Sequence, residues 1–174
     1  MAKIRKWVAY RRLERPYTRI SKFREKAYIR ITPHVKIAKF DMGNLKKRFD
    51  YYLHLVSKTD LQIRDNAIES ARQVGNRMLE KNLAKNEYFF QTKVYPHHIL
   101  RENPLAAGAG ADRMSTGMAH SFGKVMGIAA QVKKNAPIFT VKVDKQNLDF
   151  ARRVLRRAST KLPCSCSLIL EKTK

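Results

Sequence analysis

The sequence predicts an α+β fold in which a mixed or antiparallel β-sheet carries two helices on one face. The main observation is that the order strand–helix–strand occurs twice, over residues 51–95 and 137–170. In both cases, runs of aromatic and β-branched residues, which favour strands, flank a segment with apolar residues at helical spacing. The 174 residues, 44% of them hydrophobic, are enough for a single domain with its own core.

The first two strands are expected between residues 36 and 57. Residues 36–41 (KIAKFD) alternate apolar and polar side chains, which predicts a strand, and residues 42–44 (MGN) predict a turn after it. Residues Tyr51–Ser57 (YYLHLVS) are rich in aromatic and branched side chains and predict the second strand.

The first helix is expected from Thr59 or Asp60 to about Leu83, because Thr59 and Gln62 have the spacing of a capping box. Gly75 inside this helix indicates close packing against a neighbour. A strand over residues 87–95, a corner at Pro96 and residues 98–101 then lead into a loop. The apolar stripe of the helix consists of Leu61, Ala67, Ile68, Ala71, Val74, Met78 and Leu79.

After the loop, residues 125–132 and 137–143 predict two strands joined by a turn at Asn135 and Ala136. Asp144 is expected to cap a second helix that ends near Ala158, and residues 166–170 predict a final strand. The inward residues of this helix are expected to be Leu148, Ala151, Val154, Leu155 and Ala158.

The charge of the chain indicates a polyanionic partner. The formal net charge is +23 and the pI is about 10.4. Residues 1–50 carry 16 lysines and arginines against 4 acidic residues, residues 124–174 carry 12 against 3, and residues 51–123 carry 9 against 7. The two ends are therefore expected to face an anion and the middle to form the core. Nucleic acid fits best, because phosphate contacts release condensed counterions; an anionic membrane surface is the weaker option.

Residues 1–35 are expected to be an extended basic arm, because Pro16 and Pro33 interrupt regular structure. Aromatic residues among its arginines suit RNA, since unstacked bases accept aromatic faces while cations bind phosphates. A solvated basic tail is the alternative.

Four arginines of the second helix exceed what its dipole needs and predict a phosphate-binding face. They are Arg152, Arg153, Arg156 and Arg157.

The long loop is expected over residues 101–124 (RENPLAAGAGADRMSTGMAHSFGK), and it is expected to be flexible. Glycine and alanine let a backbone approach a crowded surface without side-chain clashes. Its cations can bind phosphates, and its hydroxyl groups can donate to phosphates or 2′-hydroxyls. A linker without a role is the alternative. Four of the seven glycines of the chain lie here, at Gly108, Gly110, Gly117 and Gly123.

The sequence argues against an enzyme, a cofactor and a metal site. Residues 117–124 (GMAHSFGK) have five residues, not four, between the glycine and the Gly-Lys pair of a P-loop, and AGAGADR lacks the third glycine of a dinucleotide fingerprint. His97 and His98 are expected to point to opposite faces of a strand, and Cys164-x-Cys166 lacks a second ligand pair. His120-Ser121 has no orienting carboxylate beyond Asp112.

Two cysteines give no disulfide framework, which fits a reducing compartment. The sequence also lacks an apolar segment of signal-peptide or transmembrane length. We therefore expect a soluble cytoplasmic protein that does not bind a membrane.

Several stretches closely resemble a universal family of large-subunit ribosomal proteins, called L-sixteen in bacteria and L-ten-e in archaea and eukaryotes. AGADRMSTGM and SFGK resemble the long loop of that family, although the preceding NPLAAGAG departs from it. The resemblance extends to RPYTR, KIAKFDMGN, HHILREN and LRRASTKLP, and so covers nearly the whole chain. The arm resembles the archaeal branch.

The resemblance implies an α/β-hammerhead-like fold and a structural, non-catalytic role. It implies binding to large-subunit ribosomal RNA near the peptidyl transferase centre, contact with neighbouring ribosomal proteins, and help in positioning A- and P-site tRNA. The expected rRNA-binding residues are Arg11, Arg12, Arg15, Arg19, Arg24, Arg152, Arg153, Arg156 and Arg157. The expected tRNA-proximal residues are Arg101, Gly108, Gly110, Asp112, Arg113, Ser115, Thr116, Gly117, Ser121, Gly123 and Lys124.

Two alternatives remain open at this point. One is a free-standing RNA-binding protein or RNA chaperone that uses the same basic surface away from the ribosome. The other is an RNA-directed enzyme with the loop as a lid, which would need a catalytic constellation that the sequence does not contain.

Overall fold

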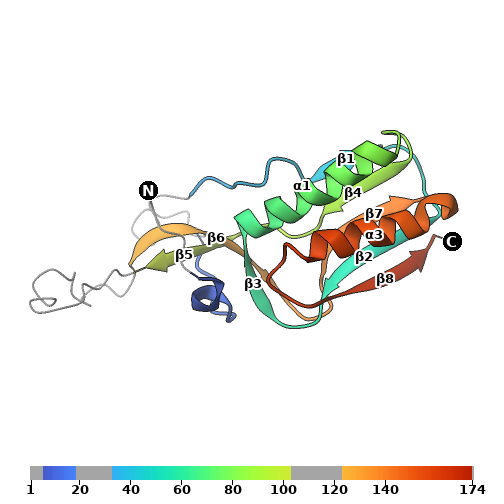
Figure 1. Cartoon of the computed structure of the whole chain (residues 1–174). Helices are drawn as coiled ribbons and strands as arrows, with labels where there is room; N and C mark the ends of the chain where they lie inside the picture. The colour runs from blue at the N-terminus through green and yellow to red at the C-terminus, as the bar shows by residue number, and fades with distance from the viewer. Residues whose placement is uncertain (1–5, 19–32, 103–122, 174) are drawn as a thin grey trace, which may run out of the picture.

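A computed structural model describes residues 6–18, 33–102 and 123–173 of the chain (Figure 1). Every strand pair in these residues is antiparallel. The predicted α+β class with two helices is therefore confirmed. Among the same residues, two short 3₁₀ helices, labelled η1 and η3, accompany the two α-helices. In chain order the elements are η1 (Trp7–Tyr10), β1 (Asp41–Gly43), β2 (Tyr51–Ser57), β3 (Leu61–Arg64), α1 (Asp65–Asn82), β4 (Tyr88–Thr92), β5 (His98–Glu102), β6 (Lys124–Val132), β7 (Pro137–Val143), η3 (Lys145–Asn147), α3 (Leu148–Ser159) and β8 (Cys166–Lys172).

The strands of the described residues form two sheets, where the sequence predicts one. The larger has the strand order β1-β4-β7-β2-β8, and the smaller has the order β3-β6-β5. Helices α1 and α3 pack side by side on one face of the larger sheet (Figure 1). The smaller sheet extends beyond the start of α1, at the opposite end of the molecule from the C-terminus (Figure 1). Its hairpin β5–β6 is thereby held away from the helical layer.

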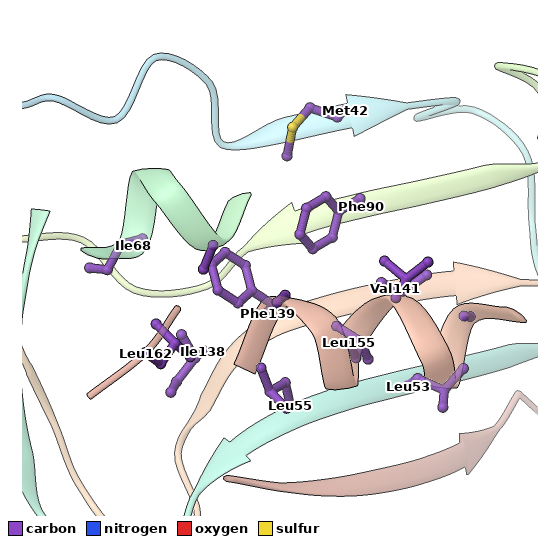
Figure 2. Close-up of a cluster of buried hydrophobic side chains, with 14 of the residues drawn as sticks. Met42, Leu53, Leu55, Ile68, Phe90, Ile138, Phe139, Val141, Leu155 and Leu162 are labelled. Atoms are coloured by element: carbon purple, nitrogen blue, oxygen red, sulfur yellow. The ribbon is translucent and has the colours of Figure 1, made fainter. Parts of the chain in front are cut away.

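The main core lies between the two helices and the larger sheet, where side chains of β2, β4 and β7 meet those of the helices (Figure 2). The rings of Phe90 and Phe139 are tilted against each other, with centroids 5.4 Å apart. A Cβ atom on Gly75 would lie 3.2 Å from the Phe90 ring. The close packing predicted for Gly75 is confirmed, because the helix approaches the sheet there through its backbone.

The predicted start of the first helix is wrong. Residues Leu61–Arg64 form β3, which pairs with β6, and α1 begins at Asp65. The proposed capping box therefore does not form: Ser57 Oγ donates to the Thr59 carbonyl, and Asp60 accepts the Lys134 N–H at 2.6 Å. Pairing with a distant strand outweighs a local capping signal here.

The predicted strand over residues 36–41 is also wrong in its bounds. Strand β1 covers Asp41–Gly43 and so includes two residues expected in a turn. The preceding backbone is bound by a helix instead, because the Lys36 and Ala38 N–H groups donate to Asp65 and Glu69 of α1, both at 3.3 Å.

Three other bounds differ less. Asp144 makes no side-chain capping bond; it accepts a hydrogen bond from Lys47 Nζ at 2.7 Å, and α3 begins at Leu148 after η3. Strand β4 is shorter than the predicted 87–95, and β8 is longer than the predicted 166–170. Strand β7 has the predicted bounds. The predicted inward residues of α3 are confirmed: four are buried, and Leu148 is half-buried and packs against the core.

Gly43 lies where the backbones of β1 and β4 come close together. Its φ of +91° lies in the left-handed region, and a Cβ atom would collide with the backbone carbonyl of Tyr88. The same carbonyl accepts the Asn44 N–H at 2.9 Å, which fixes the chain as it leaves β1. Both the backbone conformation and the available space require glycine at this position.

We expect Gly43→Ala to lower the free energy of unfolding by about 2–4 kcal/mol, because left-handed strain adds to a backbone clash. Gly127→Ala is the matched control, since nothing lies within 4 Å of a Cβ atom on Gly127. It should change stability by less than about 1 kcal/mol. Urea unfolding followed by circular dichroism measures both variants, and equal effects would contradict the assignment.

Candidate RNA interface

The described part of the arm, residues 6–18, crosses the three-stranded sheet. Two buried or half-buried glutamines bind its backbone. The Gln62 N–H donates to the Arg11 carbonyl at 3.1 Å, and Gln62 Nε2 donates to the Arg12 carbonyl at 2.5 Å. Gln131 Nε2 donates to the Glu14 carbonyl at 2.8 Å. Because Gln62 lies on β3 and Gln131 on the adjacent β6, these bonds lead the arm across the sheet.

The arm reaches the third strand, β5, at Tyr17. The Ile99 N–H donates to the Tyr17 carbonyl at 2.9 Å, and the Tyr17 N–H lies 2.9 Å from Nδ1 of His98. His98 must present an unprotonated Nδ1 to accept this bond. Burial lowers the pKa of His98, Glu14 opposes that shift and Arg101 adds to it. The neutral imidazole that the arm needs is therefore the favoured form at neutral pH.

Three aromatic rings in the described part of the arm lie against guanidinium groups. That aromatic residues of the arm stack on RNA bases stays a prediction. A stacked guanidinium can offer N–H edges to phosphate oxygens. Arg11 is exposed, whereas Arg64 already donates through Nη2 to the Lys6 carbonyl at 3.4 Å. The rings therefore hold arginines in place at this surface. The pairs, with the distance from guanidinium carbon to ring centroid, are Arg11 on Trp7 (5.2 Å), Arg64 on Tyr10 (4.5 Å) and Arg101 on Tyr17 (3.7 Å).

The arm arginines that the structure describes are exposed. Arg11, Arg12 and Arg15 project from the backbone that Gln62 and Gln131 hold. Fixing the backbone lowers the entropy that binding would otherwise cost. The other two predicted contacts of the arm, Arg19 and Arg24, lie outside the described residues.

Arg101 and Lys124 lie in strands, which corrects their expected place in the loop. Arg101 pairs with Val125 and Glu102 with Lys124, so β5 and β6 form a hairpin stem up to the edge of the described residues. Lys124 is exposed, and Gly123, with a φ of +57°, precedes it. The remaining predicted loop residues lie outside the described residues: Gly108, Gly110, Asp112, Arg113, Ser115, Thr116, Gly117 and Ser121.

The four arginines of α3 lie on the helical layer of the other sheet, and so form a second group of cations. Arg153, Arg156 and Arg157 are exposed. Arg152 is half-buried and paired with Asp149 at 2.9 Å, and so is less available to a phosphate. The C-terminal turn of α3 points toward the three-stranded sheet (Figure 1).

Sequence reasoning missed the residues that position the arm. Gln62, Gln131 and His98 are polar residues inside strands, and Gln62 and His98 are 1% and 4% exposed. The available signal was a polar side chain in an apolar strand run, because a buried polar group needs a hydrogen-bonding partner. The sequence around each residue could not reveal that its partner is the arm, which lies 50 to 117 residues earlier in the chain.

No group of three histidine, cysteine or acidic side chains is placed to bind a metal within residues 6–18, 33–102 and 123–173. His98 is buried and His97 is exposed, as expected for neighbours in an extended segment. Across the same ranges, no helix has the length and apolar character needed to span a bilayer.

Comparison with known proteins identifies a family over most of the chain. The sequence model of the family described as ribosomal protein L16p/L10e matches residues 14–169. Large ribosomal subunit protein uL16 of Methanococcus maripaludis is 46% identical over 166 residues, covering 95% of this chain and 92% of that protein. The protein of the same name from Archaeoglobus fulgidus is 43% identical over 163 residues, covering 94% and 90%. These relatives are archaeal, which confirms the predicted branch.

We expect docking of the arm to weaken in acid. Because the pKa of His98 is lowered below 6.5 in the folded chain, its contribution is fully present above that value and is lost as pH falls through the lowered pKa. Hydrogen exchange of the Tyr17 and Ile99 amides, corrected for intrinsic rates, measures this. His97→Gln should keep the pH dependence and His98→Gln should abolish it. Unchanged protection from about pH 7 to about pH 4 would refute the role of His98.

Proposed function

The chain belongs to the ribosomal protein L16p/L10e family, and from this membership we propose that it binds large-subunit rRNA near the peptidyl transferase centre and helps to position A- and P-site tRNA. As a family member it is a protein of the large ribosomal subunit and not an enzyme. Its partners therefore include ribosomal RNA and neighbouring ribosomal proteins. Membership of this family replaces the two alternatives considered from the sequence, a free-standing RNA-binding protein and an RNA-directed enzyme.

The observation that carries the proposal is the arm fixed across the three-stranded sheet. Its backbone is bound at β3, β6 and β5, while Arg11, Arg12 and Arg15 stay exposed. A basic segment whose backbone is already ordered can bind phosphates at defined spacing. The net charge of +23 adds a long-range attraction toward RNA.

The cations of α3 extend this footprint in the proposal. Arg153, Arg156 and Arg157 are exposed on a helix that packs on the larger sheet, so their spacing is set by the helix and not by a flexible segment. Two groups of cations on two sheets suit a partner that contacts the protein from more than one side, as folded ribosomal RNA can.

The loop beyond the β5–β6 stem is proposed to approach tRNA. The stem lies away from the helical layer (Figure 1), and Tyr17 of the arm forms hydrogen bonds with His98 and Ile99 of its strand β5. A rigid stem fixes the direction in which the loop extends, and the glycines of the loop allow a close approach to RNA. Arg113 is the proposed loop cation for the tRNA backbone.

We expect replacement of Arg11, Arg12 and Arg15 by glutamine to reduce the salt dependence of RNA binding. If each arginine contacts one phosphate, the slope of log K against log salt should fall by about 2–3. Binding to large-subunit particles stripped of this protein, measured at several potassium concentrations, tests this. The control replaces three other exposed lysines by glutamine and removes the same charge: Lys81 in the last turn of α1, Lys85 just after α1, and Lys46, whose N–H donates to Asn44 beside Asn86. If both triple variants lose equal slope, the arm is not the footprint.

We expect Arg113→Gln to separate tRNA positioning from subunit binding. Subunits that carry this variant should bind P-site tRNA more weakly, by about 10- to 150-fold if one charge-assisted contact is lost, because such contacts contribute about 1.5–3 kcal/mol. Incorporation of the protein into the subunit should be unchanged on salt-washed gradients. The arm variant should show the reverse pattern, and an Arg113 variant that fails to incorporate would place this residue in the rRNA footprint.

A further inference from the structure

The two cysteines of the chain lie together where the α3–β8 connection enters β8. The Sγ atoms of Cys164 and Cys166 are 3.6 Å apart, and both side chains are half-exposed. Residues two apart share one side of extended backbone. The connection bends at Cys164, and β8 begins at Cys166. The two thiols are thus neighbours that small reagents can reach.

The two thiols are electrostatically unequal. A hydrogen bond from Cys166 lowers the pKa of Cys164 to about 7, against the opposing effect of burial. The hydrogen bond to Cys164 and burial raise the pKa of Cys166. About half of Cys164 is therefore thiolate at neutral pH, whereas Cys166 stays protonated and can donate its S–H to that thiolate. A thiolate is the reactive form in thiol–disulfide exchange.

We propose that Cys164 and Cys166 form a reversible dithiol–disulfide pair, in which Cys164 is the attacking thiol and Cys166 the resolving thiol. The oxidant is a low-molecular-weight disulfide. The Cys164 thiolate attacks one sulfur of that disulfide, breaks its S–S bond and releases one small thiolate, which leaves a mixed disulfide on Cys164. The released thiolate takes the proton of Cys166, whose sulfur then attacks Cys164 Sγ and releases the second small molecule as its thiolate, which takes a proton from water.

The site needs little movement for this step. A disulfide bond is about 2.05 Å long, so the Sγ atoms must approach by about 1.5 Å, within reach of side-chain rotation. The residue between the cysteines, Ser165, accepts the Lys58 N–H through its carbonyl at 3.0 Å. Closing the ring around Ser165 strains this bond at the end of β2.

The two cysteines lie next to the hydrogen bonds that join the two sheets. Cys166 pairs with Ser57 in the β2–β8 ladder, and the Ser57 backbone also bonds to Asn135 and Ala136 in the turn that joins β6 to β7. Oxidation therefore acts at the junction of the two sheets, from which the β5–β6 stem projects. The Lys58 amide reports on this junction.

The test is incubation of the purified native full chain with oxidised glutathione, followed by mass spectrometry. The wild-type chain should lose two hydrogens without keeping an adduct, and dithiothreitol should restore its mass. Cys166→Ser should retain one glutathione on Cys164, whereas Cys164→Ser should react at least about tenfold more slowly. Lys58 amide exchange should be faster in the oxidised chain than in the reduced chain.

Wild-type chain offers a check that needs no variant. Brief treatment with iodoacetamide near pH 7 should label Cys164 at least about tenfold faster than Cys166, and this preference should vanish in denaturant. The proposal is overturned by two retained glutathiones on the wild-type chain, by disulfide-linked dimers in place of the intramolecular product, or by equal labelling of the native thiols.

Discussion

The arrangement of the molecule depends on the hydrogen-bonded junction where the chain passes twice between its two sheets. The Asn135 N–H donates to the Ser57 carbonyl at 2.8 Å, and the Ser57 N–H donates to the Ala136 carbonyl at 3.3 Å. The Lys134 N–H completes the junction through Asp60 at 2.6 Å. Asn135 adopts a φ of +62°, which asparagine tolerates better than most residues. Because the turn joins β6 to β7, each the inner strand of its sheet, the junction fixes the direction of the stem relative to the core.

A second constraint comes from buried carboxylates on α1. Glu69 and Arg72 form an ion pair at 2.6 Å with side chains 12% and 9% exposed, and the hydrogen bond from Arg72 holds the pKa of Glu69 below its usual value despite burial. Glu69 also accepts the Ala38 N–H, and Asp65 accepts the Lys36 N–H. A buried pair contributes little net stability by itself, because desolvation offsets its attraction. Its role here is to bind the backbone that leads from the arm into β1.

Local signals predicted some elements well and others wrongly, for identifiable reasons. Strand β7 was found at its bounds because a turn precedes it and the pattern ends at Asp144. Strand β3 was mistaken for helix because Leu61 fits the apolar stripe of α1 as well as the alternation of a strand, and its partner β6 lies about 70 residues later. The exposed arginines of the arm and α3 were identifiable from composition. The docking of the arm was not, since Gln131 and Glu14 are 117 residues apart.

Those long separations have a consequence for the order in which the protein is made. The arm is translated first, yet Gln62 follows its partner Arg12 by 50 residues, His98 follows Tyr17 by 81, and Gln131 follows Glu14 by 117. At about 5–20 residues per second, the last of these partners is added roughly 6–23 s after Glu14. Throughout that interval the nascent arm carries its positive charge without the surface on which it later rests. The emerging chain is thus an undocked polycation for most of its synthesis, open to whichever polyanion reaches it first.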